Sequence, residues 1–349
     1  MLESLRSHPV AQLTLMRFRE MVREPGAVFW AFGFPILLSV ALGIAFRVKG
    51  PDPVVVGVLP GVPAAMCDSL TKGGVQVRPL DQAGVRTALR AGQVAVVLLP
   101  AEQPGGPITY RFDPTRPEAR LGRATVDALL QKAAGRQDPL AVRDAEVHEP
   151  GSRYIDFLIP GLLAMNLMSG SMWGIGWVIV EMRVRKLLKR LLAAPMRRRH
   201  LLFAFGLSRL MVIPAEMAML LLFARLVFGV HVAGSYAALA LVAVAGAASF
   251  AAVAILVSCR AQNTQTVSGL MNLVMLPMFV LSGVFFSSAN FPEVMRPFIR
   301  GLPLTAMCDG LRAVMIDGAG LAGTLPALAV LAAWGIVSFA LGLRWFRWG

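Results

Sequence analysis

The sequence is poor in charged residues and in the residue types that build metal or disulfide sites. Only 15% of its 349 residues are charged and 56% are hydrophobic, whereas soluble domains carry about 25% charged residues. The three cysteines, Cys67, Cys259 and Cys308, match no zinc or disulfide-framework spacing. His148 has no neighbouring His or Cys, so no metal site is predicted. This composition predicts a membrane protein.

The chain also lacks the phosphate-binding pattern GxxxxGK[ST], so we do not expect it to hydrolyse a nucleotide by itself. No nucleophile constellation stands out, and no catalytic residue is predicted. Asp113 and Glu118 lie at a turn marked by Pro114 and Pro117 and are interpreted as surface charges. The net charge of +14 would suit nucleic acid, but many of the cationic residues flank apolar segments, where they set topology and meet lipid headgroups. Nucleic-acid binding is therefore not expected.

Six segments are long and apolar enough to cross a bilayer, which takes about 20 residues of helix. The predicted transmembrane helices are residues 27–46, 157–180, 201–228, 235–258, 265–287 and 322–343. Five of them fall in a membrane domain over residues 154–349. The predicted fold is an α-helical integral membrane protein with six transmembrane helices.

The distribution of Lys and Arg predicts which ends of the helices face the cytoplasm. The amino-terminal segment, the loop over residues 181–200, the loop after the fourth span and the carboxyl-terminal tail together hold fifteen such residues. The opposite side holds three, apart from the long insert after the first span. Both termini and the 181–200 loop are therefore predicted to be cytoplasmic.

The insert over residues 47–153 has the composition of a soluble domain, with fourteen Lys or Arg and eleven Asp or Glu. Its apolar runs predict strands near residues 54–59, 75–80, 94–100 and 108–112, alternating with helices near residues 64–73, 81–93 and 117–132. Such alternation is typical of a small α/β domain with a mainly parallel sheet. The orientation places this domain outside the cytoplasm, since long domains translocate regardless of charge.

Polar residues inside the predicted spans are candidates for function. Glu216 lies near the middle of the third span, on the helix face opposite Arg225. Arg209 and Arg225 lie near the ends of that span and are expected to extend toward the headgroups. For Glu216 a substrate or proton role, an interhelical hydrogen bond and a water-lined cleft all remain open. Asn166 and Asn272 are further candidates for the translocation pathway.

Small residues and short helices complete the predicted membrane domain. The spacing of Gly170 and Gly174 allows close helix approach within a bundle or a dimer. Residues 290–316 predict two short helices, re-entrant or interfacial, on the outer side. Cys308 would lie there, and a disulfide with Cys67 stays open.

Three segments together resemble the membrane subunit of ABC-2 type exporters, also called type V ABC transporters. They are RFREMVREPGAVFWAFGFPILLSVALG (residues 17–43), VRKLLKRLLAAPMRRRHLLFAFGLSRL (residues 184–210) and LSGVFFSSANFPEVMRPFIRGLPLTAMCDGLRAVMIDG (residues 281–318). The insert matches the branch of that family with a large extracytoplasmic domain after the first span. Lys189 and Ala194 depart from the family pattern, which has Glu and Thr there.

The resemblance implies a permease that dimerises with itself or with a homologous chain. Two copies of a separate ATPase subunit would bind ATP and Mg, and this chain would carry no cofactor. The cytoplasmic loop would form the coupling contact with the ATPase, through Arg185, Lys186, Leu188, Lys189, Arg190, Leu191, Leu192 and Pro195. An interfacial helix within residues 1–26 would contribute Arg17, Arg19 and Arg23. The implied location is the bacterial inner membrane, among its lipids.

Two other functions remain open from the sequence. One is a secondary transporter or channel that uses Glu216 for ion coupling, although such carriers usually show inverted repeats or several buried charges. The other is a membrane-anchored structural or sensory protein whose insert binds a ligand. The sequence does not indicate which substrate an exporter of this kind would carry.

Overall fold

The protein is described by a computed structural model covering residues 23–45, 54–100, 106–137, 153–187 and 198–346, together with residues 16, 19 and 140. Side chains are described for these residues except residue 27 and residues 198–204. The chain divides into two compact units. One unit comprises Met1–Arg47 and His148–Gly349, and the other comprises Val48–Val147. We call them the helical unit and the α/β unit.

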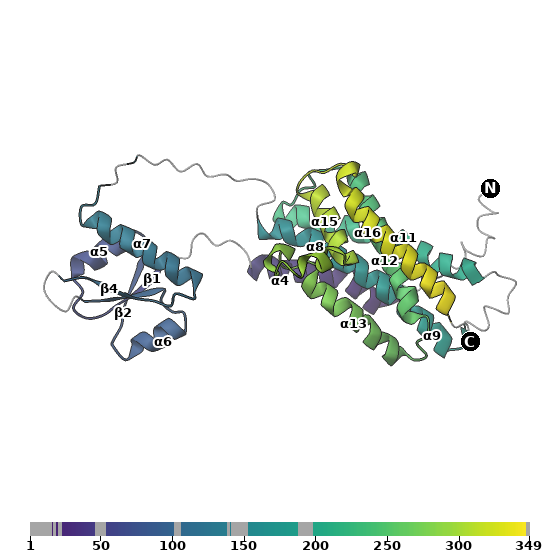
Figure 1. Ribbon diagram of the computed structural model, residues 1–349, viewed down its shortest axis with the longest axis horizontal. Coiled ribbons are helices and arrows are strands. Elements are labelled where there is room, and N and C mark those ends of the chain that lie inside the picture. Colours follow the sequence, from purple (N-terminus) through teal and green to yellow (C-terminus); the bar gives the residue numbers. More distant parts are fainter. Residues whose placement is uncertain are drawn as a thin grey trace. The chain divides into compact units, whose positions relative to one another are not determined.

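The α/β unit is a four-stranded sheet with strand order β2-β1-β3-β4. β1 pairs in parallel with β2 and β3, and β4 pairs antiparallel with β3. Helices α5 and α7 cover one face of the sheet and α6 covers the other (Figure 1). The elements are β1 Val55–Val58, α5 Ala64–Lys72, β2 Gln76–Pro79, α6 Gly84–Arg90, β3 Val96–Leu99, β4 Thr109–Arg111 and α7 Pro117–Ala133.

The two faces of the sheet are held by separate apolar clusters, as expected for strands that are buried on both sides. Val56 and Val96 pack with Leu70 of α5 and Val126 of α7. The other face packs against Val85 and Ala88 of α6. On β4 the Tyr110 hydroxyl donates a hydrogen bond to Asp127 Oδ1 of α7 at 3.1 Å. Burial, reinforced by this carboxylate, raises the pKa of Tyr110 to about 12.

The helical unit contains, among its described residues, five helices that are long and apolar enough to cross a membrane. A shorter apolar helix runs from Phe29 to Ala45. The elements are α3 Pro25–Val28, η1 Phe29–Gly33, α4 Phe34–Ala45, α8 Tyr154–Ser171, η2 Met172–Trp177, α9 Val178–Val184, α11 Arg198–Phe228, α12 Tyr236–Ser258, α13 Thr264–Leu281, η3 Ser288–Asn290, α14 Arg296–Arg300, α15 Pro303–Met315 and α16 Leu321–Trp345. Of these, η1 and η2 are π-helical and η3 is a 3₁₀ turn.

The prediction for the fifth span is wrong at its carboxyl end. Helix α13 ends at Leu281 rather than near residue 287. The chain leaves the helix through Ser282 and Gly283, and Gly283 has a φ of +73°, a conformation that favours glycine. The following segment bends back into the turn η3.

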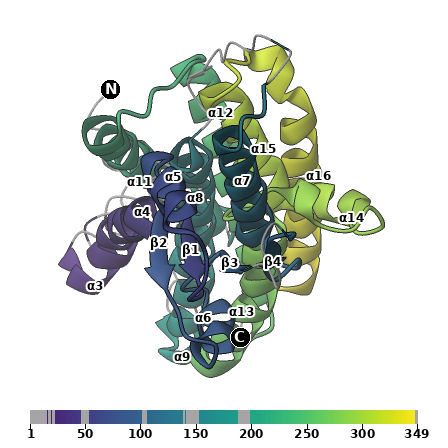
Figure 2. The same cartoon turned by 90° about the vertical axis from the view of Figure 1, so that its left-hand side faces the viewer.

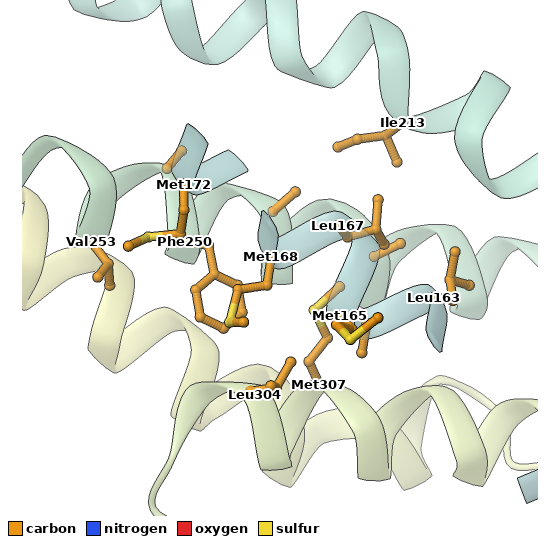
Figure 3. Close-up of a cluster of buried hydrophobic side chains, with 14 of the residues drawn as sticks. Leu163, Met165, Leu167, Met168, Met172, Ile213, Phe250, Val253, Leu304 and Met307 are labelled. Atoms are coloured by element: carbon orange, nitrogen blue, oxygen red, sulfur yellow. The ribbon is translucent and has the colours of Figure 1, made fainter. Parts of the chain in front are cut away.

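The core of the helical unit surrounds α8. Leu163, Leu167 and Met168 of α8 are buried together with Phe250 of α12 and Met307 of α15 (Figure 3). Ile213 of α11 closes the cluster from another side. Methionines occupy many of these positions, and their flexible thioethers fill irregular gaps between helices.

The segment after α13 packs onto the bundle as two short helices. α15 contacts α8, α12 and α16, and it is buried at ten of its thirteen positions. α14 has only five residues and projects beside α16 (Figure 2). Trp334 Nε1 of α16 donates to the Gly301 carbonyl at the end of α14, at 2.8 Å. All three cysteines are free thiols, and Cys308 is fully buried in α15.

Candidate functional site

The segment α8–η2–α9 is the central span of the helical unit. It forms a continuous helical segment, Tyr154–Val184, of 31 residues. In the most apolar stretch of this segment 67% of the residues are buried. In the corresponding stretches of the other four candidate spans 22–56% are buried. Its last residues, 181–184, begin the basic loop that the resemblance predicts to be the coupling contact. The predicted loop therefore continues directly from the most enclosed helix of the bundle.

A buried ion pair on α11 faces this span. The Arg209 guanidinium donates to both carboxylate oxygens of Glu216, at 2.6 and 2.7 Å. The Arg209 side chain is 7% exposed and the Glu216 side chain is 0% exposed. A two-bond fork of this kind is the strongest arrangement for Arg and a carboxylate. Both charges lie on α11, so the pair stays within one helix.

Helix α8 provides the surface on which the ion pair rests. Arg209 Nε donates to Ser171 Oγ at 3.3 Å, and Arg209 Nη2 donates to the Leu167 carbonyl at 3.4 Å. A Cβ on Gly170 would collide with the guanidinium. Gly170 is therefore needed to admit Arg209. A Cβ on Gly174 would meet no described atom of this chain within 4 Å, so Gly174 is not needed for the contact with Arg209, and the predicted packing of the two glycines at a dimer interface stays a prediction.

One expectation for the third span is thereby corrected. The expectation that Arg209 extends toward the headgroups is wrong, because the side chain turns inward to Glu216. Seven residues make nearly two full turns of α-helix, so positions 209 and 216 share a face. Arg225 is exposed, and the part of α11 that carries Glu216 is held by an intrahelical ion pair supported by α8.

Three other arginines bind backbone carbonyls at the carboxyl ends of long helices. Arg153 donates to the Phe228 carbonyl of α11, Arg183 to the Ser258 carbonyl of α12, and Arg312 to the Gly283 carbonyl just after α13. The last carbonyls of a helix have no intrahelical donor and form the negative end of its dipole. In hydrocarbon such groups cost several kcal/mol unless they are paired. Each arginine lies in a different segment from the carbonyl that it binds. It therefore connects two parts of the bundle and also satisfies a carbonyl at or just after the end of a helix.

These contacts define two ends of the helical unit. The α8 end, by our definition, contains Arg153, Phe228, Gly283 and Arg312. There Arg312 Nη2 lies 2.5 Å from the Gly283 carbonyl, and the guanidinium stacks 3.6 Å from the centre of the Phe157 ring. A Cβ on Gly161 would lie 2.6 Å from the Val284 carbonyl oxygen and 3.2 Å from Arg312 Nη2, so glycine is required here chiefly by the close approach of the Val284 backbone.

The α9 end, defined by Arg183, Ser258, Ala261 and Phe346, is organised around one guanidinium. Arg183 donates to the Ser258 carbonyl at 3.0 Å, to the Cys259 carbonyl at 3.2 Å, and to the Ala261 carbonyl. Its guanidinium carbon lies 5.3 Å from the centre of the Phe346 ring, which follows α16. The last turn of α9 is thus bound to the α12–α13 turn and packed against the end of α16.

The exposed side of α9 leads into the predicted coupling loop. Arg185 pairs with Glu181 one turn earlier at 2.7 Å. Lys186 has a φ of +57°, a left-handed conformation that non-glycine residues rarely adopt. Its N–H donates to the Arg183 carbonyl at 3.0 Å and closes the helix end. The direction in which the chain leaves α9 is therefore set by a specific helix-terminating turn.

The structure describes part of the residues predicted for coupling. Arg185 and Lys186 lie at the end of α9 with exposed side chains, and Arg19 and Arg23 are helical and exposed. Outside the described residues lie Arg17, Leu188, Lys189, Arg190, Leu191, Leu192 and Pro195. The role predicted for this whole set remains a prediction.

The three candidates for the translocation pathway have different surroundings. Glu216 is paired with Arg209. Asn166 Nδ2 donates to the Ala31 carbonyl of the π-helical turn η1 at 3.1 Å, and so joins α8 to the first apolar helix. Asn272 is exposed on α13. Each therefore has its own environment, and the described contacts do not gather them into one polar path.

Sequence reasoning missed the roles of Arg153, Arg183 and Arg312, which it counted only toward charge and topology or toward the resemblance. Their partners lie 29 to 155 residues away in the chain. No local spacing indicates such a contact. The pairing of Arg209 with Glu216 was missed as well, although their seven-residue spacing places both side chains on one face of the helix.

Comparison with known proteins finds a family match that includes most of the helical unit and the whole insert. Residues 25–344 match the model of a protein family described as "ABC-2 family transporter protein". A curated relative, ABC transporter G family member 20 of Dictyostelium discoideum, is 26% identical over 205 residues. That match covers 58% of this chain and 28% of the relative. The chain thus corresponds to less than a third of the length of that relative.

Proposed function

This chain belongs to the ABC-2 family of transporter proteins, and on that premise we propose that it is the permease subunit of an ATP-driven exporter. It is a multi-pass membrane protein and a transport subunit. In our proposal, six spans form one half of the export pathway, and a separate ATPase subunit, present in two copies, binds ATP and Mg. The loop over residues 181–200 receives the movement of that ATPase.

The observation that carries this proposal is the position of the central span. Tyr154–Val184 is the most buried of the candidate spans and leads directly into the basic loop. Along its length it is fixed to α11 by the Arg209 site, and at its last turn to the α12–α13 turn by Arg183. In the proposal, a displacement of the loop is therefore passed through these contacts to α11 and to the α12–α13 turn.

The two ends of the helical unit support the proposed orientation. The α9 end carries the exposed cationic residues Arg185, Lys186, Arg260 and Arg344, which suits the cytoplasmic side. A Cβ on Gly43, near the end of α4, would meet Phe228 and Ile155, so α4 ends at the α8 end. The chain leaves the helical unit at that end and returns there at Arg153. We infer that residues 47–153 lie outside the cytoplasm.

A second copy of the permease is also part of the proposal. Helix α13 exposes Leu273, Leu276 and Val280, together with the polar Asn272. An amide that faces lipid lacks hydrogen-bond partners, whereas one that faces another helix gains them. We therefore infer that this face of α13 packs against a second copy or a homologous permease in the bacterial inner membrane. Surrounding lipids would cover the remaining apolar faces.

The alternative of a secondary transporter or channel that uses Glu216 has less support. Both carboxylate oxygens of Glu216 accept hydrogen bonds from Arg209, and the side chain is fully buried. An ion-coupling carboxylate must exchange its proton or ion with water during each cycle. The observed pairing favours a structural role for Glu216.

The experiment that tests the proposal measures ATP hydrolysis by the partner ATPase, alone and with this chain in lipid nanodiscs. We expect the two to co-purify and the permease to change the ATPase rate. The variant Arg190→Glu with Leu191→Ala should weaken both effects, since these residues lie in the proposed coupling loop. The matched control is Arg344→Glu, the same charge reversal at an exposed residue of the α9 end outside that loop.

Failure to co-purify with an ATPase encoded beside this chain would contradict the proposed function. If the complex forms but the loop variant hydrolyses ATP like the control, the loop is not the coupling contact. Proton flux into vesicles that contain the chain without the ATPase would instead favour the carrier that uses Glu216.

A further inference from the structure

The last turn of α9 presents its charged side chains on two different sides. Glu181 and Arg185 pair with each other on the exposed side. Arg183, between them in sequence, turns inward and donates to the carbonyls of Ser258, Cys259 and Ala261. Among the described residues of the 181–187 segment, Arg183 is thus the cationic side chain that is bound to other helices of the bundle.

The α12–α13 turn depends on this guanidinium. Ser258 is the last residue of α12 and Cys259 caps it, so their carbonyls have no intrahelical donor. Ala261 lies two residues before Asn263, the residue that caps the amino terminus of α13. A single planar guanidinium thus holds the end of one helix and the approach to the next. Its five donors in a fixed fork suit three convergent carbonyls, whereas a Lys ammonium is a point charge on a flexible stem.

The contact extends to a third helix. Phe346 follows directly after α16, and the centre of its ring lies 5.3 Å from the guanidinium carbon of Arg183. Helix α12 packs extensively against α16 and α15. Movement of the last turn of α9 is therefore passed to α12 and α13 through hydrogen bonds and to α16 through the ring.

We propose that Arg183 is a positioning residue that transmits displacement of the coupling loop to the α12–α13 turn. The proposal rests on the proposed function, because it assumes that an ATPase moves the 181–200 loop. It adds a defined route: loop, α9, guanidinium, turn. Arg183 contacts neither the ATPase nor the substrate in this scheme, and it acts through the turn that it holds.

The test compares three forms of the complete complex, permease with ATPase, in lipid nanodiscs: wild type, Arg183→Lys and Arg344→Lys. Both substitutions keep a positive charge at the α9 end, but only the first removes a guanidinium from the carbonyl cluster, since Arg344 is exposed and lies outside the coupling loop. Hydrogen exchange is measured for peptides that cover residues 257–266, without nucleotide and with ATP trapped by vanadate. The ATPase rate of each complex is measured beside that of the ATPase alone.

We expect ATP trapping to change exchange in the turn for wild type and Arg344→Lys, and not for Arg183→Lys. The permease-dependent change in ATPase rate should fall about tenfold in Arg183→Lys, the effect of losing one charge-assisted hydrogen bond. A purely structural role would raise exchange in both nucleotide states and leave their difference intact. Loss of the difference is therefore the signature of positioning.

The variant Phe346→Leu provides a second test in case Arg183→Lys folds poorly. It weakens the contact of the ring with Arg183 and changes no charge. It should reduce the nucleotide response of the turn in the same direction and by less. A response that survives unchanged in both variants overturns the proposal. If even wild type fails to bind the ATPase, the proposed function fails first, and the two failures are distinguishable.

Discussion

Separating the buried pair of α11 tests whether Arg209 and Glu216 are held by each other or merely lie close. The perturbations are Arg209→Met and Glu216→Leu, singly and together. Each single change leaves one charge in a site where Arg209 is 7% exposed and Glu216 is 0% exposed. Removing one partner of a buried ion pair costs about 3–5 kcal/mol, which is more than a hundredfold in the ratio of folded to unfolded protein.

The double variant should behave quite differently. Replacing both charges with apolar side chains of similar size is often neutral or stabilising. Here it leaves no new orphan on α8, because the Ser171 hydroxyl already donates to the Leu167 carbonyl at 2.7 Å. We therefore expect the double variant to lie within about 1 kcal/mol of wild type, with a large coupling between the two positions.

The assay is equilibrium unfolding by SDS in mixed micelles, followed by far-ultraviolet circular dichroism. Arg225→Met is the matched control, since Arg225 lies on the same helix with an exposed side chain, and it should shift stability by no more than about 0.5 kcal/mol. The reasoning is refuted if the two single changes are as mild as this control, or if the double variant costs their sum.

Three further predictions concern other parts of the chain. Gly170→Ala should destabilise the protein by about 1–3 kcal/mol, because its Cβ would press on the buried guanidinium, whereas Gly174→Ala, in open space, should be close to neutral; the same SDS titration measures both. Lys186→Gly should stabilise the protein by about 1 kcal/mol, since φ of +57° suits glycine, and a loss of stability would show that the lysine side chain matters more than its backbone. Because the pKa of Tyr110 in the folded chain is raised to about 12 from an ordinary 10.0, its contribution is complete below pH 10 and is lost as pH rises toward about 12. A phenolate absorbance titration should show the late ionisation, and Asp127→Ala, which removes the carboxylate partner, should move it earlier.

The elements that sequence predicts best are those set by local pattern. The apolar run at residues 54–59 becomes β1 at Val55–Val58, and the charge-free run at residues 235–258 becomes α12 at Tyr236–Ser258. Periodicity and uninterrupted apolar length act over a few turns, so they can be recognised without knowledge of the partner. The end of α13 was missed because Phe285 and Phe286 continue the apolar run beyond the point where Gly283 turns the chain.

Contacts between distant segments could not be predicted from the sequence. The position of Arg312 after α13 gives no hint that its guanidinium will reach the Phe157 carbonyl, 155 residues earlier. Charge counting assigns Arg183 to topology, which uses its sign but ignores its direction. The direction depends on which carbonyls lack donors in the folded bundle, and that is known only once the helices are packed.

The way in which buried charges are paired in this bundle also bears on which energy source drives transport. Three charged side chains are buried in the described part of the chain: Asp156, Arg209 and Glu216. Arg153 donates two hydrogen bonds to Asp156, and Arg209 donates two to Glu216. A carrier driven by an ion gradient needs a buried charge whose partner changes during transport, because that exchange is the coupling step. Here each buried charge is matched by a two-bond fork and serves to fix helices in place. A bundle built in this way is suited to move when it is pushed at one end, which favours an ATPase at the α9 end over an ion crossing the middle.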